Sequence, residues 1–146
     1  MDTLEDQINM KNLFFNITEL PSIPNNPASW LSYLNAYIPR FTNHSEEYFA
    51  AGKMIPPDKL YSWTKEFLQD AGKCFEKDIV FDEERQKIVA SRILAEYIGL
   101  MTSEEILNAI MTSEQICATS NLNSYVIFFF LSLFHLFPSV IINSIQ

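Results

Sequence analysis

Glycine and cysteine are scarce in this sequence, which has three glycines and two cysteines among 146 residues. Three glycines leave little from which to build a phosphate-binding loop or a Gly-x-Ser-x-Gly nucleophile turn, and neither motif occurs. The two cysteines, Cys74 and Cys117, stand alone and form neither a disulfide framework nor a zinc pattern. These shortages count against a P-loop enzyme, a serine hydrolase and a disulfide-stapled secreted protein.

Positive charge is also in short supply, because 18 acidic residues outweigh 10 basic ones and the formal net charge is −8. An acidic chain repels phosphate backbones, so direct nucleic-acid binding is not expected. Every charged residue lies at or before Glu114, and the final 32 residues carry none. We therefore divide the chain into a helical body, residues 1–120, and an uncharged apolar tail, residues 121–146. The lone cysteines favour a reducing compartment, nuclear or cytoplasmic.

No group of residues indicates catalysis. The only two histidines, His44 and His135, are far apart in sequence and have no ligand-spaced neighbours, so we expect no metal site and no cofactor. Cys74 lies near two lysines and is a candidate nucleophile, but no base accompanies it and a structural thiol is favoured. Carboxylates cluster where helices are expected to start, so the helix dipole explains them: Glu46 and Glu47, Asp82 to Glu84, and Glu104 with Glu105. We expect a protein that is not an enzyme.

The body shows the apolar spacing of amphipathic helices. Three prolines between residues 21 and 27 predict an extended connector, because each lacks an amide donor. Apolar residues at intervals of three and four predict helices on either side of it. The expected helices cover residues 4–19, the stretch between Pro27 and Pro39, residues 45–51 and residues 59–74.

The strongest helical pattern runs from Asp82 to Met101. Asp82 suits an N-cap, with two glutamates near the positive end of the dipole. Alternation of the strand type is hardly seen anywhere, so the sequence gives little support for a sheet. The apolar stripe of this helix contains Val89, Ala90, Ile93, Leu94, Tyr97, Ile98 and Met101.

A near-repeat follows, in which residues 101–106 recur as residues 111–116. Each copy has Thr followed three residues later by Glu or Gln, the spacing of a capping box. The repeat predicts two consecutive helix starts, at Thr102 and Thr112. Together these patterns predict an all-α fold: a small array of four to six antiparallel amphipathic helices, HEAT-like or an irregular bundle, plus a C-terminal apolar helix.

The tail contains an almost unbroken apolar run of 18 residues, Tyr125–Ile142. As a helix it would extend about 27 Å, close to the roughly 30 Å of a bilayer core. Two residues within the run, Pro138 and His135, weigh against a membrane anchor, and so does the absence of any lysine or arginine after Arg92. The residues that would face lipid include Tyr125, Phe128, Phe129, Phe130, Phe134, Phe137 and Ile142.

Two other interpretations of the tail stay open. It is either a genuine buried helix of the fold or an accidental extension, translated from retained T-rich non-coding sequence. The second is suggested by the sudden loss of charge after Gln115 and by the abundance of Phe, Leu, Ile, Ser, Asn and Tyr.

The stretch from Asp82 to Met101 resembles the inner helix of a HEAT-type repeat, at Arg85, Val89, Ala90, Leu94 and Gly99. More widely, residues 27–101 are similar to part of the HEAT-rich arm of the TATA-binding-protein-associated Snf-type remodelling ATPases. In that family the arm grips TATA-binding protein while a separate motor hydrolyses ATP. The resemblance implies TATA-binding protein as a partner. This chain has no helicase motif, so it would supply only scaffold and contact surface.

The function expected from the sequence is therefore a non-enzymatic helical protein-interaction fragment of a transcription regulator. The alternative is a small membrane protein anchored by its C-terminal apolar segment. Aromatic residues on the expected helix faces are the candidates for contact with a partner protein, although for any one of them plain core packing is the more common role. These candidates are Trp30, Tyr33, Tyr37, Tyr61, Trp63 and Phe67.

Overall fold

The computed structural model describes residues 3–20, 23, 29–97, 99–122, 124–130 and 138–145, the last two ranges as backbone alone. Helices make up the larger part of this small protein, and strands form one sheet. In chain order the elements are α1 (Leu4–Thr18), α2 (Trp30–Phe41), α3 (Ser45–Ala50), α4 (Pro57–Gln69), the 3-10 helix η1 (Lys73–Asp78), β1 (Ile79–Asp82), β2 (Lys87–Glu96), α5 (Ser103–Thr119), β3 (Ser124–Phe130) and β4 (Pro138–Ile145).

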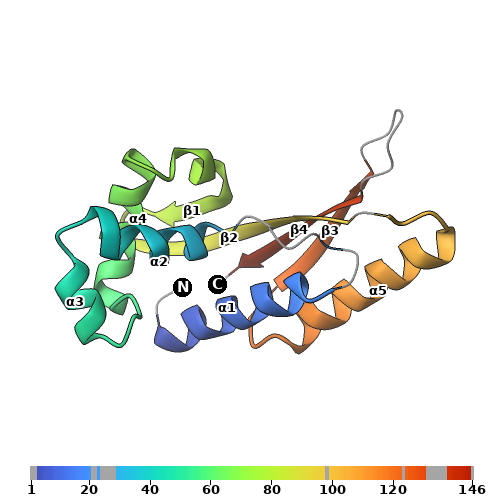
Figure 1. The fold of residues 1–146 in the computed structure, drawn as a ribbon, viewed down its shortest axis with the longest axis horizontal. Coiled ribbons are helices and arrows are strands. Elements are labelled where there is room, and N and C mark those ends of the chain that lie inside the picture. The colour runs from blue at the N-terminus through green and yellow to red at the C-terminus, as the bar shows by residue number, and fades with distance from the viewer. Residues whose placement is uncertain are drawn as a thin grey trace.

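The four strands form an antiparallel sheet in the order β1-β2-β4-β3. Helices α2, α3 and α4 pack together at one end of the molecule, and α1 lies beside α5, as Figure 1 shows. The prediction that helices dominate is confirmed. The prediction of an all-α fold is wrong, because the sheet joins residues 79–96 to residues 124–145.

The helix expected from Asp82 to Met101 is not formed. Asp82 instead ends β1, and its carboxylate accepts a hydrogen bond from the Arg85 backbone amide at 3.0 Å in the turn between the strands. Gln86 closes that turn with a φ of 54°. Residues 87–96 then form β2, so the residues that resemble a HEAT inner helix are a turn and a strand here.

Burial along β2 follows the strand period. Ser91, Ile93 and Ala95 are at most 4% exposed, whereas Leu94 between them is 42% exposed. The sequence hid this alternation because two of the buried positions are a serine and an alanine. A bulge also breaks the alternation, because Val80 pairs with Ala90 but the next residue of β1 pairs with Ile88, which leaves Val89 without a partner in the register.

The prediction of a C-terminal apolar helix is also wrong. The run Tyr125–Ile142 overlaps two strands, β3 and β4, and the part between them lies outside the described residues. β4 pairs with β2 from Ala90↔Ile145 to Glu96↔Ser139, so the tail shares one sheet with the body. Within the described residues, no helix is both long enough and apolar enough to cross a bilayer.

Several helix predictions are confirmed, with shifted ends. α1 begins at a capping box between Thr3 and Asp6, and α4 begins with Pro57 in its first turn. α2 continues through Pro39 to Phe41, three residues beyond its expected end. The near-repeat gives one helix, α5, whose capping box joins Thr102 to Glu105, with no second start at Thr112.

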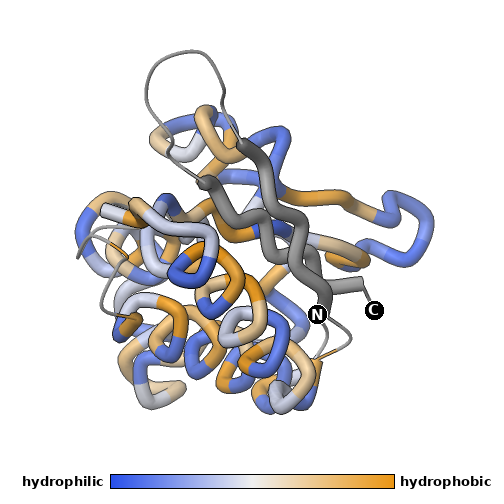
Figure 2. Tube along the Cα trace, turned by 90° about the vertical axis from the view of Figure 1, so that its right-hand side faces the viewer, coloured by the Kyte–Doolittle hydropathy of each residue, from blue (hydrophilic) through white to orange (hydrophobic). Residues whose placement is uncertain are grey.

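The core is a single cluster of apolar side chains that lies between the helices and β2. The amphipathic character of the helices is visible in Figure 2 as hydrophilic and hydrophobic stretches that alternate along the chain. Gly72 lies directly against the ring of Phe67, so a Cβ at this position would clash with the ring. No side chain fits at position 72 unless this buried ring moves.

Candidate functional site

The six aromatic residues proposed for partner contact divide into two groups. Trp30, Tyr37, Trp63 and Phe67 are at most 5% exposed and belong to the core. Tyr33 is 50% exposed, and Tyr61 is partly exposed. Only the last two present much surface to another molecule.

Tyr33 belongs to a chain of aromatic rings that joins α2, α4 and η1. The centroid of its ring lies 5.1 Å from the ring centroid of Phe75, and the ring centroids of Phe75 and Phe67 are 6.1 Å apart. Phe67 contacts Tyr37 at 5.4 Å, and Tyr37 stacks on Phe41 at 5.8 Å. Both ends of this series of rings reach the surface, because Tyr33 is 50% exposed and Phe41 is 70% exposed. We name Tyr33, Tyr37 and Phe41 the aromatic edge.

The aromatic edge lies on one side of α2 because its members are four residues apart. Sequence reasoning missed Phe41, since the helix was expected to end before Pro39. The four-residue spacing between Tyr37 and Phe41 was the sequence feature that could have placed Phe41 on the same side of the helix. Fixed rings backed by a packed core suit protein recognition, because binding them restricts little side-chain motion.

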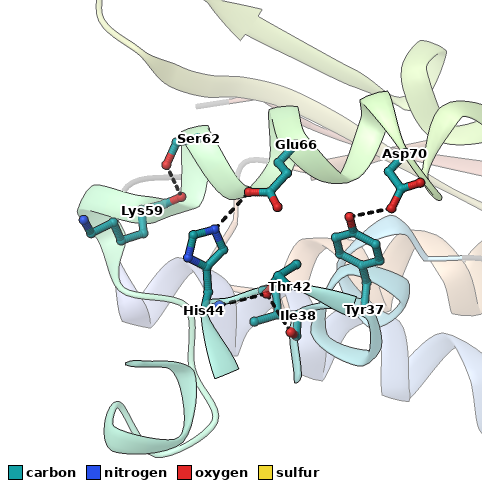
Figure 3. A network of polar contacts seen from close by, with 8 residues as sticks. All are labelled: Tyr37, Ile38, Thr42, His44, Lys59, Ser62, Glu66 and Asp70. Carbon is teal, nitrogen blue, oxygen red and sulfur yellow. Dashed lines mark hydrogen bonds and ion pairs between the residues drawn. The ribbon is translucent and has the colours of Figure 1, made fainter. Parts of the chain in front are cut away.

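Two polar pairs link Tyr37 of α2 and His44, which precedes α3, to α4 and its C-cap (Figure 3). The Tyr37 hydroxyl donates to an Asp70 carboxylate oxygen at 2.8 Å, and His44 Nε2 lies 2.9 Å from Glu66 Oε2. Glu66 lies on α4 and Asp70 is the C-cap of that helix, so its C-terminal end contacts both α2 and the residue that precedes α3. The His44 ring also stacks on Trp63, with 4.7 Å between the centroids.

The tyrosine of this network is a poor acid. Burial, together with the hydrogen bond to Asp70, raises the pKa of Tyr37 to about 12. The phenol therefore stays neutral at physiological pH and donates a hydrogen bond to the carboxylate. This arrangement positions helices and provides no general base.

The raised pKa of Tyr37 predicts a loss of stability in alkali. The phenol titrates near 10 in the unfolded chain and near 12 in the folded one, so its stabilising effect is complete below pH 10 and is lost as pH rises to 12. We expect the free energy of unfolding, measured by urea denaturation, to fall less steeply in Tyr37→Phe than in wild type across this interval. Tyr33→Phe, which alters a half-exposed ring of the same helix, is the control. Parallel profiles for wild type and Tyr37→Phe would contradict the assignment.

A second polar cluster joins α4 to the turn between β1 and β2. Glu83 pairs with Lys65 at 2.5 Å and accepts a hydrogen bond from Tyr61, and these contacts lower the pKa of the Glu83 carboxyl. The Lys65 ammonium also lies 4.4 Å from the ring centroid of Phe81. This cluster accounts for one of the predicted carboxylate groups as a surface ion pair.

A cavity of about 400 Å³ adjoins Lys65, and its described lining contains no histidine or cysteine. The cavity is lined by Lys65, Leu68, Gln69, Lys73, Glu76 and Phe81.

The other predicted carboxylate groups lie at helix starts. Glu105 completes the capping box of α5, and hydrogen bonds from the backbone amides of Met101 and Thr102 lower the pKa of the Glu105 carboxyl. Glu46 and Glu47 lie in the first turn of α3.

The thiols and imidazoles are dispersed. Cys74 is exposed and Cys117 is buried, and they form no disulfide with each other. His44 belongs to the network above, and His135 lies outside the described residues. Across the part of the chain that the structure describes, no three His, Cys, Asp or Glu side chains gather in a way that could hold a metal ion.

Comparison with known proteins adds no assignment: no protein-family model, no curated protein and no solved structure matches this chain.

Proposed function

We propose that this chain is a non-enzymatic protein-interaction domain and that the aromatic edge of α2 binds its partner. The observation that carries the proposal is the exposure of Phe41, 70%, and of Tyr33, 50%, at the two ends of a packed chain of rings. Large apolar side chains held rigidly at a surface are the residues that contribute most to protein binding.

The partner contacts are reassigned relative to the sequence prediction. Tyr33 is retained and Phe41 is added, whereas Trp30, Trp63 and Phe67 are buried. Of these three, Phe67 supports the aromatic edge through its ring contact with Tyr37. TATA-binding protein stays a prediction that comes only from the resemblance. The proposal does not depend on it, because the Asp82–Met101 stretch that carries the resemblance forms no helix in this structure.

The proposal is tested by affinity capture on the full-length protein. We expect Phe41→Ser to reduce recovery of specific partners about tenfold or more, while its melting temperature stays close to wild type because the side chain is exposed. Met101→Ser, at an 84% exposed position away from α2, is the matched control and should capture as wild type does.

Two outcomes would count against this function. One is recovery of chaperones alone by the wild-type protein. The other is equal capture by wild type and Phe41→Ser, which would show that the aromatic edge contributes nothing to binding.

A further inference from the structure

The strand β3 forms one end of the sheet. Among the described residues it pairs with β4 on one side only, through seven consecutive register pairs from Ser124↔Ser144 to Phe130↔Pro138. Its seven residues, at about 3.4 Å each, give an edge roughly 24 Å long. Along such an edge, the backbone N–H and C=O groups that point away from the sheet are available to another strand.

The strand itself lacks the sequence and register features that normally prevent strand pairing. The sequence of β3, SYVIFFF, contains no charged residue and no proline, and its register with β4 has no bulge. The strand at the other end of the sheet is different. β1 has four residues, ends in the charged Asp82, and is interrupted by a bulge against β2.

Charge favours a second copy of this chain as the occupant. The net charge of −8 opposes self-association over most of the surface. β3 and β4 themselves add nothing to this repulsion, because every charged residue lies at or before Glu114 and both strands are uncharged. A copy that approaches through β3 therefore brings an uncharged strand against an uncharged strand.

Geometry favours the same occupant. The edge of an antiparallel strand matches its own copy after a rotation by 180°, so two identical edges can exchange hydrogen bonds across a two-fold axis. We propose that two copies of this chain associate by antiparallel pairing of β3 with β3, which joins two four-stranded sheets into one of eight strands. This inference is independent of the aromatic edge, which lies on α2.

The first test measures the mass of the purified full-length protein by sedimentation velocity over a wide range of concentration. We expect a reversible equilibrium between monomer and dimer. Hydrogen exchange should show alternate amides of β3 protected in the dimer and exchanging at least about tenfold faster at dilutions where the monomer dominates. A wild-type protein that is monomeric at every concentration would overturn the proposal, and so would open-ended fibres.

Adjacent proline variants provide the second test. Successive amides of a strand point to opposite edges, so one of Ile127→Pro and Phe128→Pro removes a donor to β4 and the other removes a donor to the partner copy. We expect one variant to unfold and the other to stay folded with a dimer Kd at least about tenfold weaker. Ile127→Val is the control and should dimerise normally.

Each remaining result has a defined meaning. If a folded proline variant dimerises as tightly as wild type, another surface forms the dimer and the proposal is wrong. If both proline variants unfold, the hydrogen-exchange comparison on the wild-type protein decides. In that case, β3 amides equally protected in monomer and dimer would overturn the proposal, and a difference confined to alternate amides would support it.

Discussion

A chain that ends at Ser120 is expected to lose cooperative unfolding. β4 lies between β2 and β3 in the sheet and pairs with β2 through seven residues, so the truncation removes two of the four strands at once. β2 would keep only the short β1 as a neighbour, and two-stranded pairs are marginal in water. Thermal and urea unfolding, followed by circular dichroism, should show a broad transition in place of the single step of the full chain.

A full-length variant separates loss of the sheet from loss of chain length. Ile141 is opposite Leu94 near the middle of the β2–β4 pair, where a proline removes a ladder donor or distorts the strand. We expect Ile141→Pro to behave like the truncated chain and Ile141→Val to melt like wild type. If residues 1–120 melt cooperatively as a soluble monomer, the tail is not part of the fold. The interpretations as a membrane anchor or an accidental extension would then regain their weight.

The sequence predicted the helices best where burial and local preference agree. In α4 the expected stripe of Leu60, Trp63, Phe67 and Leu68 is buried. The capping box of α5 also forms as its spacing indicates, because a cap depends only on residues within one turn, whereas the second box expected at Thr112 does not form. α1 fits less well: Leu13 and Ile17 are buried, whereas Leu4 and Ile8 on the opposite side are exposed.

The strands escaped prediction because their pairing depends on residues distant in sequence. Around Ile93 and Leu94 the same apolar residues satisfy a helical period, and only the neighbouring β4 makes the extended form stable. The uninterrupted apolar run of the tail is ambiguous for a related reason, since a buried strand and a buried helix share that composition. Its richness in Phe, Ile and Val was the one local feature that favoured strands.

The candidate site was predicted in part. An aromatic spacing identifies a helix face, but it does not reveal whether that face meets the core or the solvent. Tyr37 and Tyr33 are four residues apart, yet only Tyr33 is exposed, because Phe67 of α4 and Asp70 at its C-cap contact Tyr37. Phe41 escaped because a proline two residues earlier suggested a helix end.

Replacement of Trp63 by alanine is expected to cost about 3–5 kcal/mol of unfolding free energy, as large-to-small changes of buried aromatics do. Trp63 is 3% exposed, and its ring supports the stacked His44 at the start of α3. Small domains have only about 5–15 kcal/mol in total, so a large fraction of the protein should be unfolded at elevated temperature. Urea denaturation of wild type and Trp63→Ala measures the difference directly.

Tyr33→Ala is the matched control, because it removes an aromatic ring that is half exposed. We expect this variant to lose much less stability than Trp63→Ala and to weaken partner capture more than the loss of folded protein explains. The reverse pattern, with Trp63→Ala fully folded and deficient only in binding, would show that Trp63 contacts the partner directly. Since both residues were candidates on sequence grounds, the two stability measurements separate the supporting aromatic side chains from the contacting ones.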